Sequence, residues 1–529
     1  MVVVSDVTPV SVFSSLNVAR GGMTKAVMRR ANMFTEHFDD VRILTLLFQQ
    51  NHREIIQKLY QSGQLNKKVK VSNCFIEMDP FKEKKPSKDN MANPNIKEEG
   101  FHELKASAKP TPSYRYYRDG LYVKYKRFDN EGKVVFVDVM NESRHRTHRM
   151  EYDEEGYLVR MRHMDIVKNK PRLDRYFSRN GKCYLSVWMN PDTGEAGRCQ
   201  LFYPEPKEFK NLTALYSFWI KKELKRIRNP VLLSDSRRTD AVLLDIPSRI
   251  KKVTTLHNNH YQKPFTKEAP IRTCWRNLFE NLDKFDRVVF LTHEQMKDVS
   301  DQFGTLDSYR VIPHEAKRVS AKNNTEANPH LAVSLARYEP QKRLDEAIQA
   351  FAHVVKEIPN ARYEIYGHGS EEKELQALIE QLGLENHIKL MGYTNDPVRT
   401  YQRAACTVLS SDYEGSPLVI NESLAAGTPV VIYNFKYGPK DVIRDGLDGF
   451  VVPKGDQKAL AGKIIEIMKN PPLRERMSNH ALEIVERFSF EKYEKNWVQL
   501  VKELEAEKPK NKPTMKSKLK KGFKKLLKL

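Results

Sequence analysis

The spacing of hydrophobic positions changes along the chain, and each change marks a different kind of secondary structure. Near the N-terminus, apolar runs at 10–13 and 41–48 flank a segment at 23–34 with helical periodicity. Between 114 and 203 the period falls to two, and turns with Asn, Asp or Glu near Gly separate the apolar runs. From about 212 the alternation of strands and helices returns. The pattern predicts an α/β protein with an inserted antiparallel β module.

Two parallel, doubly wound sheets are expected, the second beginning at 330–335 and continuing through a last strand at 429–432. If the sheets face each other, ligands bind in the cleft between the carboxyl ends of their strands. The stretch 79–112 is rich in Lys, Pro and Asn, which is typical of a linker or long loop. The predicted divisions are a first domain in two parts (1–78 and 209–322), an inserted β domain (79–208), a second domain (323–505) and a basic tail (506–529).

Positive charge is the strongest compositional signal. The formal net charge is +22, and the segment 508–529 contains ten lysines and no acidic residue. Such a field attracts nucleic acid, anionic lipid or a polyphosphate polymer, and charge alone does not choose among them. The apolar residues of the tail fall on one helical face, which favours an anionic membrane surface, whereas its prolines and glycine favour a solvated charge run. These are Met515, Leu519, Phe523, Leu526 and Leu527 against Pro509, Pro513 and Gly522.

Cysteine usage and hydropathy indicate the compartment. The five cysteines are dispersed and form no Cys-x-x-Cys pair, which predicts reduced thiols and no zinc site. The first twenty residues lack a basic segment, and no apolar run reaches the length of a transmembrane helix. We therefore expect a cytoplasmic protein that at most rests on a membrane surface.

The segment 414–422 is the most specific site candidate. It follows a buried strand at 406–409 and enters a helix expected at 421–426. The unpaired N–H groups of a helix N-terminus suit a diphosphate. Glu422 can accept hydrogen bonds from ribose hydroxyls, and Glu414 can accept them from a sugar. The alternative is that two surface glutamates straddle an ordinary helix start.

Glu414 and Glu422, with seven residues between them, match the Glu-x7-Glu signature of retaining GT-B glycosyltransferases of family four, and the sequence around them resembles that family. The matching segments are 334–337, 341–345, 366–369 and 392–393. The resemblance implies that Arg337 and Lys342 grip the diphosphate of the donor, with catalytic roles for both and for Glu414. It also implies that the nucleotide sugar contacts Gly367, His368, Tyr393, Gly415, Ser416, Pro417, Leu418 and Glu422.

No cofactor or metal is expected. Two cations and a helix N-terminus can neutralise a departing nucleoside diphosphate in a dry cleft. Many other transferases use a divalent metal held by an Asp-x-Asp motif, and this chain contains no two aspartates with that spacing.

The N-terminal half supplies the other wall of the expected site. Gly21 and Gly22 permit close approach of backbone to phosphate or sugar, and the resemblance places them at the donor and Arg20 near the acceptor. His257 follows an expected strand at 253–256 and, by resemblance, is a catalytic residue that contacts the transferred sugar. His260 is a second choice, on the acceptor side. Two satisfied loop histidines are the alternative.

Within the family, the chain resembles bacterial wall teichoic acid α-glycosyltransferases, through the segments 17–24 and 434–439 and the β insertion. The sequence Ile-Pro-His at 312–314 departs from the more usual Ile-Pro-Asn. The resemblance implies a retaining hexosyltransferase that uses UDP-glucose or UDP-N-acetylglucosamine and a polyanionic polyol-phosphate acceptor. It further implies a homo-oligomer, with a trimer favoured, at the inner face of the bacterial plasma membrane. The alternatives are an O-glycosyltransferase of a serine-rich adhesin and a basic nucleic-acid- or membrane-binding scaffold without catalysis; no nucleic-acid motif is present.

Overall fold

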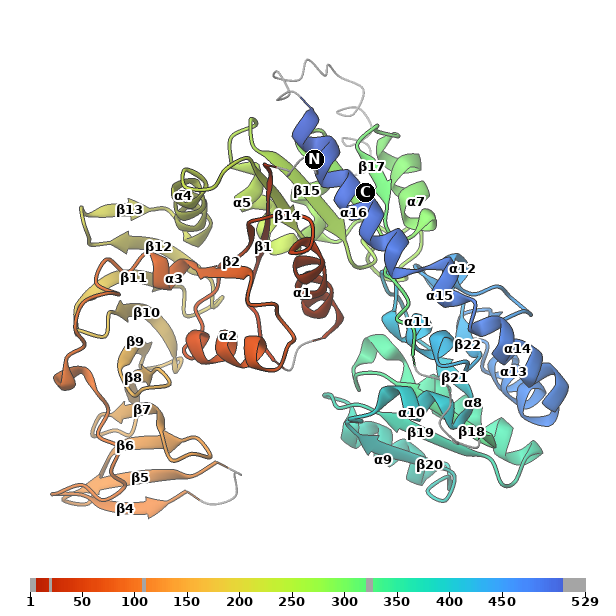
Figure 1. The fold of residues 1–529 in the computed structure, drawn as a ribbon. Coiled ribbons are helices and arrows are strands. Elements are labelled where there is room, and N and C mark those ends of the chain that lie inside the picture. The colour runs from red at the N-terminus through yellow and green to blue at the C-terminus, as the bar shows by residue number, and fades with distance from the viewer. Residues whose placement is uncertain (1–5, 19–20, 107–110, 320–326, 508–529) are drawn as a thin grey trace. The chain divides into compact units, whose positions relative to one another are not determined.

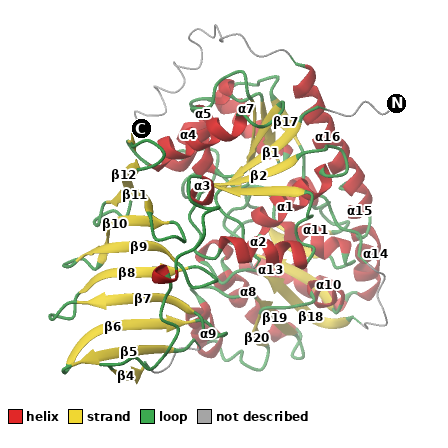
Figure 2. Ribbon diagram, turned by 60° about the vertical axis from the view of Figure 1, so that its left-hand side comes forward, coloured by secondary structure: helices red, strands yellow, loops and turns green. Residues whose placement is uncertain are grey.

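The computed structural model describes residues 6–18, 21–106, 111–319 and 327–507. The chain divides into two compact units, one of Met1–Ser234 with Arg238–Ile250 and one of Asp235–Arg237 with Lys251–Leu529. Strands and helices alternate through most of both units, and one long segment of the first unit consists of strands and loops (Figure 2). The predicted α/β class with an antiparallel β insertion is therefore confirmed.

Parallel strands of the first unit lie in the order β14-β1-β2-β3. Every residue of β1 is buried, as expected for a strand covered on both faces. Helix α1 begins immediately after Gly21 and buries Val27, Ala31 and Phe34 along one side. The elements are β1 (Thr8–Phe13), α1 (Gly22–Phe34), β2 (Val41–Thr45), α2 (His52–Gln61), β3 (Val69–Asn73), α3 (Cys74–Glu77), α4 (Leu212–Leu224), β14 (Pro230–Ser234) and α5 (Asp240–Leu244).

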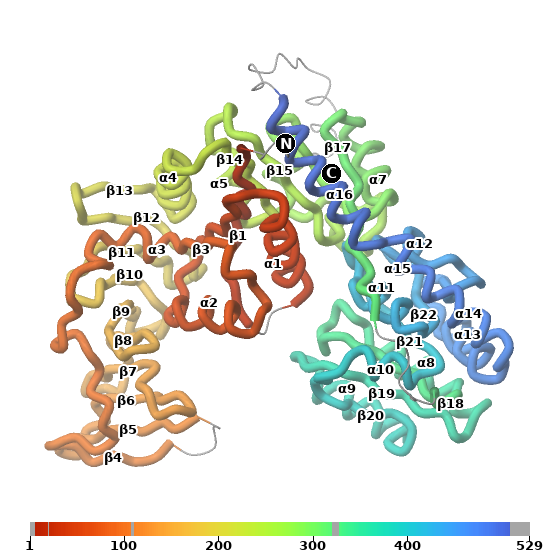
Figure 3. Tube along the Cα trace, in the orientation of Figure 1, coloured from red at the N-terminus to blue at the C-terminus, as the bar shows by residue number. Residues whose placement is uncertain are grey.

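Ten antiparallel strands between α3 and α4 form one sheet in chain order, from β4 to β13 (Figures 1 and 3). Its tight turns use the residues that the sequence indicated. At one of them Gly156 has φ +92, and Asp153 Oδ1 accepts the N–H of Tyr157. The strands are β4 (His102–Lys105), β5 (Ser113–Arg118), β6 (Leu121–Phe128), β7 (Val134–Met140), β8 (Arg146–Tyr152), β9 (Leu158–Asp165), β10 (Lys170–Phe177), β11 (Cys183–Met189), β12 (Ala196–Leu201) and β13 (Lys207–Phe209).

The stretch predicted as a linker or long loop at 79–112 is mostly loop in its described residues, and it also takes part in this sheet. It contributes the short helix η1 (Lys88–Asn90) and the edge strand β4. The buried Lys126 ammonium donates to the carbonyls of Asn93, at 2.6 Å, and Asn95, at 2.9 Å. The loop prediction is therefore confirmed for most of the described stretch. The sequence did not show that backbone carbonyls and polar side chains fasten this loop to the sheet, because such bonds leave no apolar pattern.

The second unit begins with the parallel strands β15, β16 and β17 and continues into a parallel sheet in the order β20-β19-β18-β21-β22-β23. Phe351, Ile365 and Val431 are fully buried in the core of this second sheet. The first strands and helix are β15 (Lys251–Leu256), β16 (Arg287–Phe290), α7 (His293–Phe303) and β17 (Tyr309–Val311). The second sheet and its helices are β18 (Asn328–Leu335), η5 (Pro340–Lys342), α8 (Leu344–Glu357), β19 (Arg362–Tyr366), α9 (Glu372–Gln381), β20 (Ile388–Gly392), α10 (Pro397–Gln402), β21 (Ala404–Leu409), α11 (Leu418–Ala425), β22 (Val430–Tyr433), α12 (Pro439–Val442), β23 (Gly449–Val452), α13 (Gln457–Lys469), α14 (Pro471–Ala481), α15 (Ile484–Arg487) and α16 (Phe490–Ala506).

Strand β18 pairs with β19 on one side and with β21 on the other, although β19 and β20 both precede β21 in the chain. The strand order therefore reverses at this pair, and the connections that leave β18 and β21 run in opposite directions. In open α/β sheets such a switch point opens a crevice at the carboxyl ends of the strands. None of the helices in the described part of the chain is long and apolar enough to cross a membrane.

Candidate active site

The loops that follow β18 and β21 meet at the switch point and are held together by hydrogen bonds. The amide of Gln341 donates to the carbonyl of Tyr413, at 2.8 Å, and the N–H of Asp412 donates to the carbonyl of Gln341, at 2.8 Å. The hydroxyl of Ser410 donates to the carbonyl of Lys342, at 2.9 Å. These bonds fix η5 against the start of the segment 414–422.

An ion pair joins two of the predicted site residues across these loops. Lys342 Nζ lies 2.6 Å from Glu414 Oε1, and the two side chains are 15% and 13% exposed. A pair that is partly withdrawn from water is screened less than a surface pair. The Lys342 ammonium and the Glu414 carboxylate therefore form a partly buried ion pair where the two loops meet.

Helix α11 begins at Leu418, three residues before the start expected from the sequence, and Pro417 is its N-cap residue. Proline fixes the extended backbone before the helix, so Ser416 and Pro417 lead directly into its first turn. The first N–H groups of an α-helix lack helical partners, so this end of α11 is the candidate for the anion-binding end predicted for this segment. Glu422 lies one turn further along α11 on an exposed position, where the Tyr401 hydroxyl donates to its Oε2 at 3.3 Å.

Arg337 follows β18 directly and its side chain is exposed. Among the residues that the structure describes, none pairs with its guanidinium. The neighbouring Gly367 has φ +152, and a Cβ there would lie 1.9 Å from the carbonyl oxygen of Ala336. Glycine is needed at this position because it lets the loops after β18 and β19 touch. His368 and Tyr393, from the loops after β19 and β20, are 62% and 71% exposed.

His257 approaches the Glu414 segment from the loop after β15. A Cβ on Gly415 would lie 2.1 Å from the carbonyl oxygen of His257, so the two backbones are in direct contact there. His257 Nε2 lies 2.7 Å from Asp235 Oδ1, and the side chains are 8% and 1% exposed. The His257 ring also stacks on that of His314, with 5.6 Å between centroids. His314 belongs to the Ile-Pro-His sequence at 312–314 noted above.

Sequence reasoning missed Asp235 as a site residue. The signal was present, because the expected strand at 231–234 ends in this aspartate, and strand ends at that edge are where sites form. The partner of a histidine fixes which ring nitrogen carries the proton and how the ring is oriented. Asp235 thereby presents the Nδ1 side of the His257 ring away from the carboxylate.

His260 is wholly buried, which argues against its expected contact with an acceptor. Its ring packs against Tyr261, Phe279 and Tyr437, with centroids 4.0, 5.1 and 5.9 Å away. Burial lowers the pKa of His260 to about 3, so the ring is neutral in the folded protein. It is a packing residue of the second unit.

The remaining predicted residues belong to the first unit or lie outside the described residues. Gly21 and Gly22 belong to the first unit, where Gly21 is exposed and has open space beside it. Arg20 lies outside the described residues. The described part of the chain contains no group of three or more His, Cys, Asp and Glu side chains that could hold a metal ion.

Two family models match the chain. The model described as "Glycosyl transferases group 1" matches residues 315–484, and the model described as "Glycosyl transferase 1 domain A" matches residues 11–198. The first match contains the Lys342–Glu414 pair and α11, and the second contains most of the β insertion.

Named relatives match almost the whole length. The chain is 28% identical over 499 residues to the poly(glycerol-phosphate) alpha-glucosyltransferase of Bacillus subtilis, covering 90% of this chain and 72% of the relative. It is 26% identical over 489 residues to the poly(ribitol-phosphate) alpha-N-acetylglucosaminyltransferase of Staphylococcus aureus, covering 92% and 97%.

Solved structures share the fold. A structure of a Staphylococcus aureus TarM variant in complex with fondaparinux, α-GlcNAc-glycerol and UDP matches 93% of this chain and 99% of that one, with a TM-score of 0.81 and 24% identity. The pneumococcal O-GlcNAc transferase GtfA matches 95% and 100%, with a TM-score of 0.66 and 18% identity. The family models, the relatives that match about nine-tenths of the chain and the shared fold agree. The chain belongs to the group 1 glycosyltransferases and has the GT-B fold of the wall teichoic acid enzymes, two Rossmann-like domains with a β-rich insertion.

Proposed function

We propose that the protein transfers a hexose, either glucose or N-acetylglucosamine, from a UDP-sugar to hydroxyls of a polyol-phosphate wall teichoic acid. The observation that carries the proposal is the Lys342–Glu414 pair beside the N-terminus of α11, at the switch point of the second sheet. The two relatives that match about nine-tenths of the chain are named for poly(glycerol phosphate) and poly(ribitol phosphate) acceptors.

The leaving group is a diphosphate, and the site offers it three sources of positive potential. Arg337 supplies an exposed guanidinium without a protein partner among the described residues. Lys342 supplies an ammonium on a loop fixed by hydrogen bonds. The first turn of α11 supplies unpaired N–H groups. Charge that develops as the sugar–phosphate bond breaks is stabilised best by groups that are already in place.

Glu414 and Glu422 have different tasks in this scheme. A diphosphate competes with Glu414 for the Lys342 ammonium, and the Glu414 carboxylate can then accept hydrogen bonds from sugar hydroxyls. Glu422, exposed on α11, accepts hydrogen bonds from the ribose hydroxyls of the nucleotide. His257, oriented by Asp235, belongs to the loop whose backbone lies against Gly415, and it contacts the transferred sugar.

We further propose that transfer retains the anomeric configuration. UDP-glucose and UDP-N-acetylglucosamine carry the sugar in the α configuration, and both relatives are named as alpha-transferases. An α donor that gives an α product has retained its configuration. With Arg337, Lys342 and α11 directed at the diphosphate, we propose that no metal ion takes part.

A second candidate acceptor is a serine-rich protein. The chain is 22% identical over 425 residues to a peptide N-acetylglucosaminyltransferase GtfA subunit of Streptococcus gordonii, which covers 73% of this chain and 80% of the relative. That match leaves more of the chain uncovered than the teichoic acid relatives do, so we favour the polymer.

Incubation with a panel of UDP-sugars and three acceptors tests the function directly. The acceptors are poly(glycerol phosphate), poly(ribitol phosphate) and a serine-rich peptide, and the products are examined by mass and by anomeric proton couplings. We expect an α-linked hexose on one of the two polymers. Transfer to the peptide alone would establish the second candidate, and a β-linked product would refute retention.

Lys342→Ala should lower the rate of transfer by about a hundredfold, because an ion contact to the leaving diphosphate contributes on the order of 3 kcal/mol in the transition state. Lys463→Ala is the matched control, since that lysine forms an exposed pair with Glu466 on α13. EDTA should leave the wild-type rate unchanged in initial-rate assays. Loss of activity with EDTA that Mg²⁺ or Mn²⁺ restores would show that a metal takes part.

Glu422→Gln and Glu414→Gln should affect different constants. The Glu422 variant should raise the KM for the donor and the Kd for UDP, because ribose contacts are made in the ground state as well as the transition state. The Glu414 variant should mainly lower kcat. It also releases Lys342 from its carboxylate, so its UDP affinity should be equal to or higher than that of the wild type. Calorimetric titration with UDP separates the two, and unchanged UDP affinity in the Glu422 variant would contradict the ribose assignment.

We propose that the insertion, placed at 79–208, mediates self-association and favours a trimer. Strands β4 and β13 are the edges of its sheet, and unpaired edges are suited to pairing between copies. Leu104, on edge strand β4, is an exposed apolar side chain, and Leu121 and Trp188 are exposed on β6 and β11 of the same sheet. Sedimentation should give an oligomer for the intact protein and a monomer after deletion of the insertion. A monomeric intact protein at micromolar concentration would contradict the proposal.

We also propose that the tail at 508–529, which lies outside the described residues, holds the enzyme at the inner face of the plasma membrane. Lysines near an anionic leaflet contribute up to about 1 kcal/mol each before screening. A chain that ends at Glu507 should keep its turnover on soluble acceptor and no longer pellet with phosphatidylglycerol vesicles. Continued pelleting of the shortened chain at low salt would show that another surface binds the membrane.

A further inference from the structure

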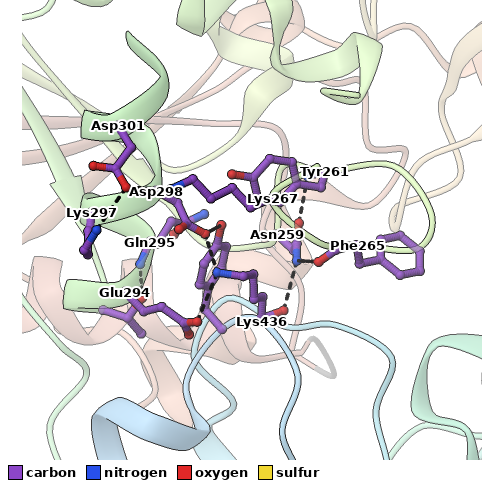
Figure 4. A network of polar contacts seen from close by, with 12 residues as sticks. Asn259, Tyr261, Phe265, Lys267, Glu294, Gln295, Lys297, Asp298, Asp301 and Lys436 are labelled. Carbon is purple, nitrogen blue, oxygen red and sulfur yellow. Dashed lines mark hydrogen bonds and ion pairs between the residues drawn. The ribbon is translucent and has the colours of Figure 1, made fainter. Parts of the chain in front are cut away.

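Lys436, in the loop after β22, lies between two carboxylates of α7. Its Nζ is 2.5 Å from Asp298 Oδ2 and 3.1 Å from Glu294 Oε1, which are one turn apart on the helix (Figure 4). The side chain of Asp298 is 7% exposed, and that of Lys436 is 23% exposed. Helix α7 follows β16, whereas Lys436 belongs to the second sheet, so this contact joins the two halves of the second unit.

The same loop holds the backbone of Glu414 from both sides. The N–H of Glu414 donates to the carbonyl of Lys436, at 3.0 Å, and the N–H of Tyr437 donates to the carbonyl of Glu414, at 3.0 Å. The amide of Asn259 also donates to the Lys436 carbonyl, at 3.0 Å (Figure 4). A displacement of the Lys436 backbone would therefore strain or break the hydrogen bonds that hold the backbone of Glu414.

Tyr437, the next residue of this loop, is also held against α7. The Tyr437 hydroxyl donates to Asp298 Oδ2 at 2.8 Å, and its ring stacks on the buried ring of His260. Burial raises the pKa of Tyr437 far above its ordinary value, so the hydroxyl keeps its proton and remains a donor. Burial by itself lowers the pKa of Lys436, but the hydrogen bonds to Asp298 and Glu294 more than offset it, and the net shift is upward. The ammonium is thus charged when the enzyme works.

We propose that Lys436 is a positioning residue for Glu414. The clamp that Glu294 and Asp298 form around its ammonium sets the loop of Lys436 and Tyr437, and the two backbone hydrogen bonds of that loop set the direction of the Glu414 side chain. The inference rests on the proposed function, in which Glu414 binds the transferred sugar. Lys436 itself touches neither the diphosphate-binding lysine nor the start of α11 in the contacts of the described residues.

A purely structural ion pair is the competing explanation, and α7 provides a matched control for it. Asp301, one turn beyond Asp298, pairs with Lys267 at 2.6 Å and Lys297 at 3.0 Å (Figure 4). This second cluster has the same chemistry on the same helix, but it makes no contact with the loop of Lys436 in the described structure. The activity of Asp301→Asn therefore shows the effect of losing a carboxylate of α7 that is not linked to the backbone of Glu414.

The test compares Lys436→Met, Lys436→Arg and Asp301→Asn in transfer and binding assays on the full-length enzyme. Lys436→Met should lower kcat by about tenfold to a hundredfold, because small misplacements of a substrate-positioning group have effects of this size. Its Kd for UDP should stay within about twofold of the wild-type value, since the diphosphate contacts remain. Lys436→Arg should recover part of the rate, and Asp301→Asn should behave as the wild type.

A double-mutant cycle with Glu414→Gln identifies the group through which Lys436 acts. If Lys436 works through Glu414, Lys436→Met should cost little further activity once Glu414 is Gln. Where turnover is too low to measure, the same double-mutant cycle can be built from binding. The quantity compared is then the ratio of the Kd for the UDP-sugar to the Kd for UDP, measured by calorimetry. An equal cost in both backgrounds, or a parallel loss of UDP affinity, would overturn the proposal.

Two further controls keep the result decisive. If Lys436→Met does not yield folded protein, Asp298→Asn and Glu294→Gln loosen the clamp one carboxylate at a time, and the same cycle applies to each. A wild-type enzyme that transfers no sugar from any UDP donor would refute the proposed function. An active wild type whose Lys436 variants match Asp301→Asn would refute this inference alone.

Discussion

The candidate site depends on the meeting of two loops at the place where the strand order of the second sheet reverses. Lys342 and Glu414 form an ion pair across these loops, and hydrogen bonds from Gln341 and Ser410 fix the backbone beneath it. The charges cannot be separated without exposing an unpaired group in a partly desolvated place. In the proposed function, a diphosphate competes with Glu414 for this lysine, so donor binding and the release of Glu414 toward the sugar would be coupled.

The site also requires close contact between the backbones of neighbouring loops, and glycine occupies the positions where they touch. Gly415 allows the segment before α11 to touch the carbonyl of His257, and Gly367 allows the loop after β19 to touch the carbonyl of Ala336. Any larger residue would place a Cβ inside another atom's radius and push the loops apart. The two glycines thus allow close contact between the loops after β21 and β15 and between the loops after β19 and β18.

Charge pairs away from the nucleotide site shape it indirectly. His257 is held by the buried Asp235, and the Glu414 backbone is held by the loop that carries Lys436. In both cases a group expected to touch substrate is oriented by a carboxylate that does not. Within the second unit, the backbone of His257 thereby lies against Gly415, the chain neighbour of Glu414, although the loops that carry them follow strands of different parallel sheets.

The sequence by itself was sufficient for the α/β rhythm, the antiparallel insertion and the segment 414–422, because period, turn residues and a spaced pair of glutamates are local properties. It also indicated Arg337 and Lys342, which follow one strand within a few residues. It placed the start of α11 three residues late, although Ser416 and Pro417 directly before Leu418 are a local signal of a helix start. The packing of 79–106 along the sheet, the burial of His260, the Asp235–His257 contact and the clamp around Lys436 required tertiary structure. Each of these depends on contacts between residues far apart in the chain or on burial away from water. Local sequence patterns show neither long-range contacts nor burial.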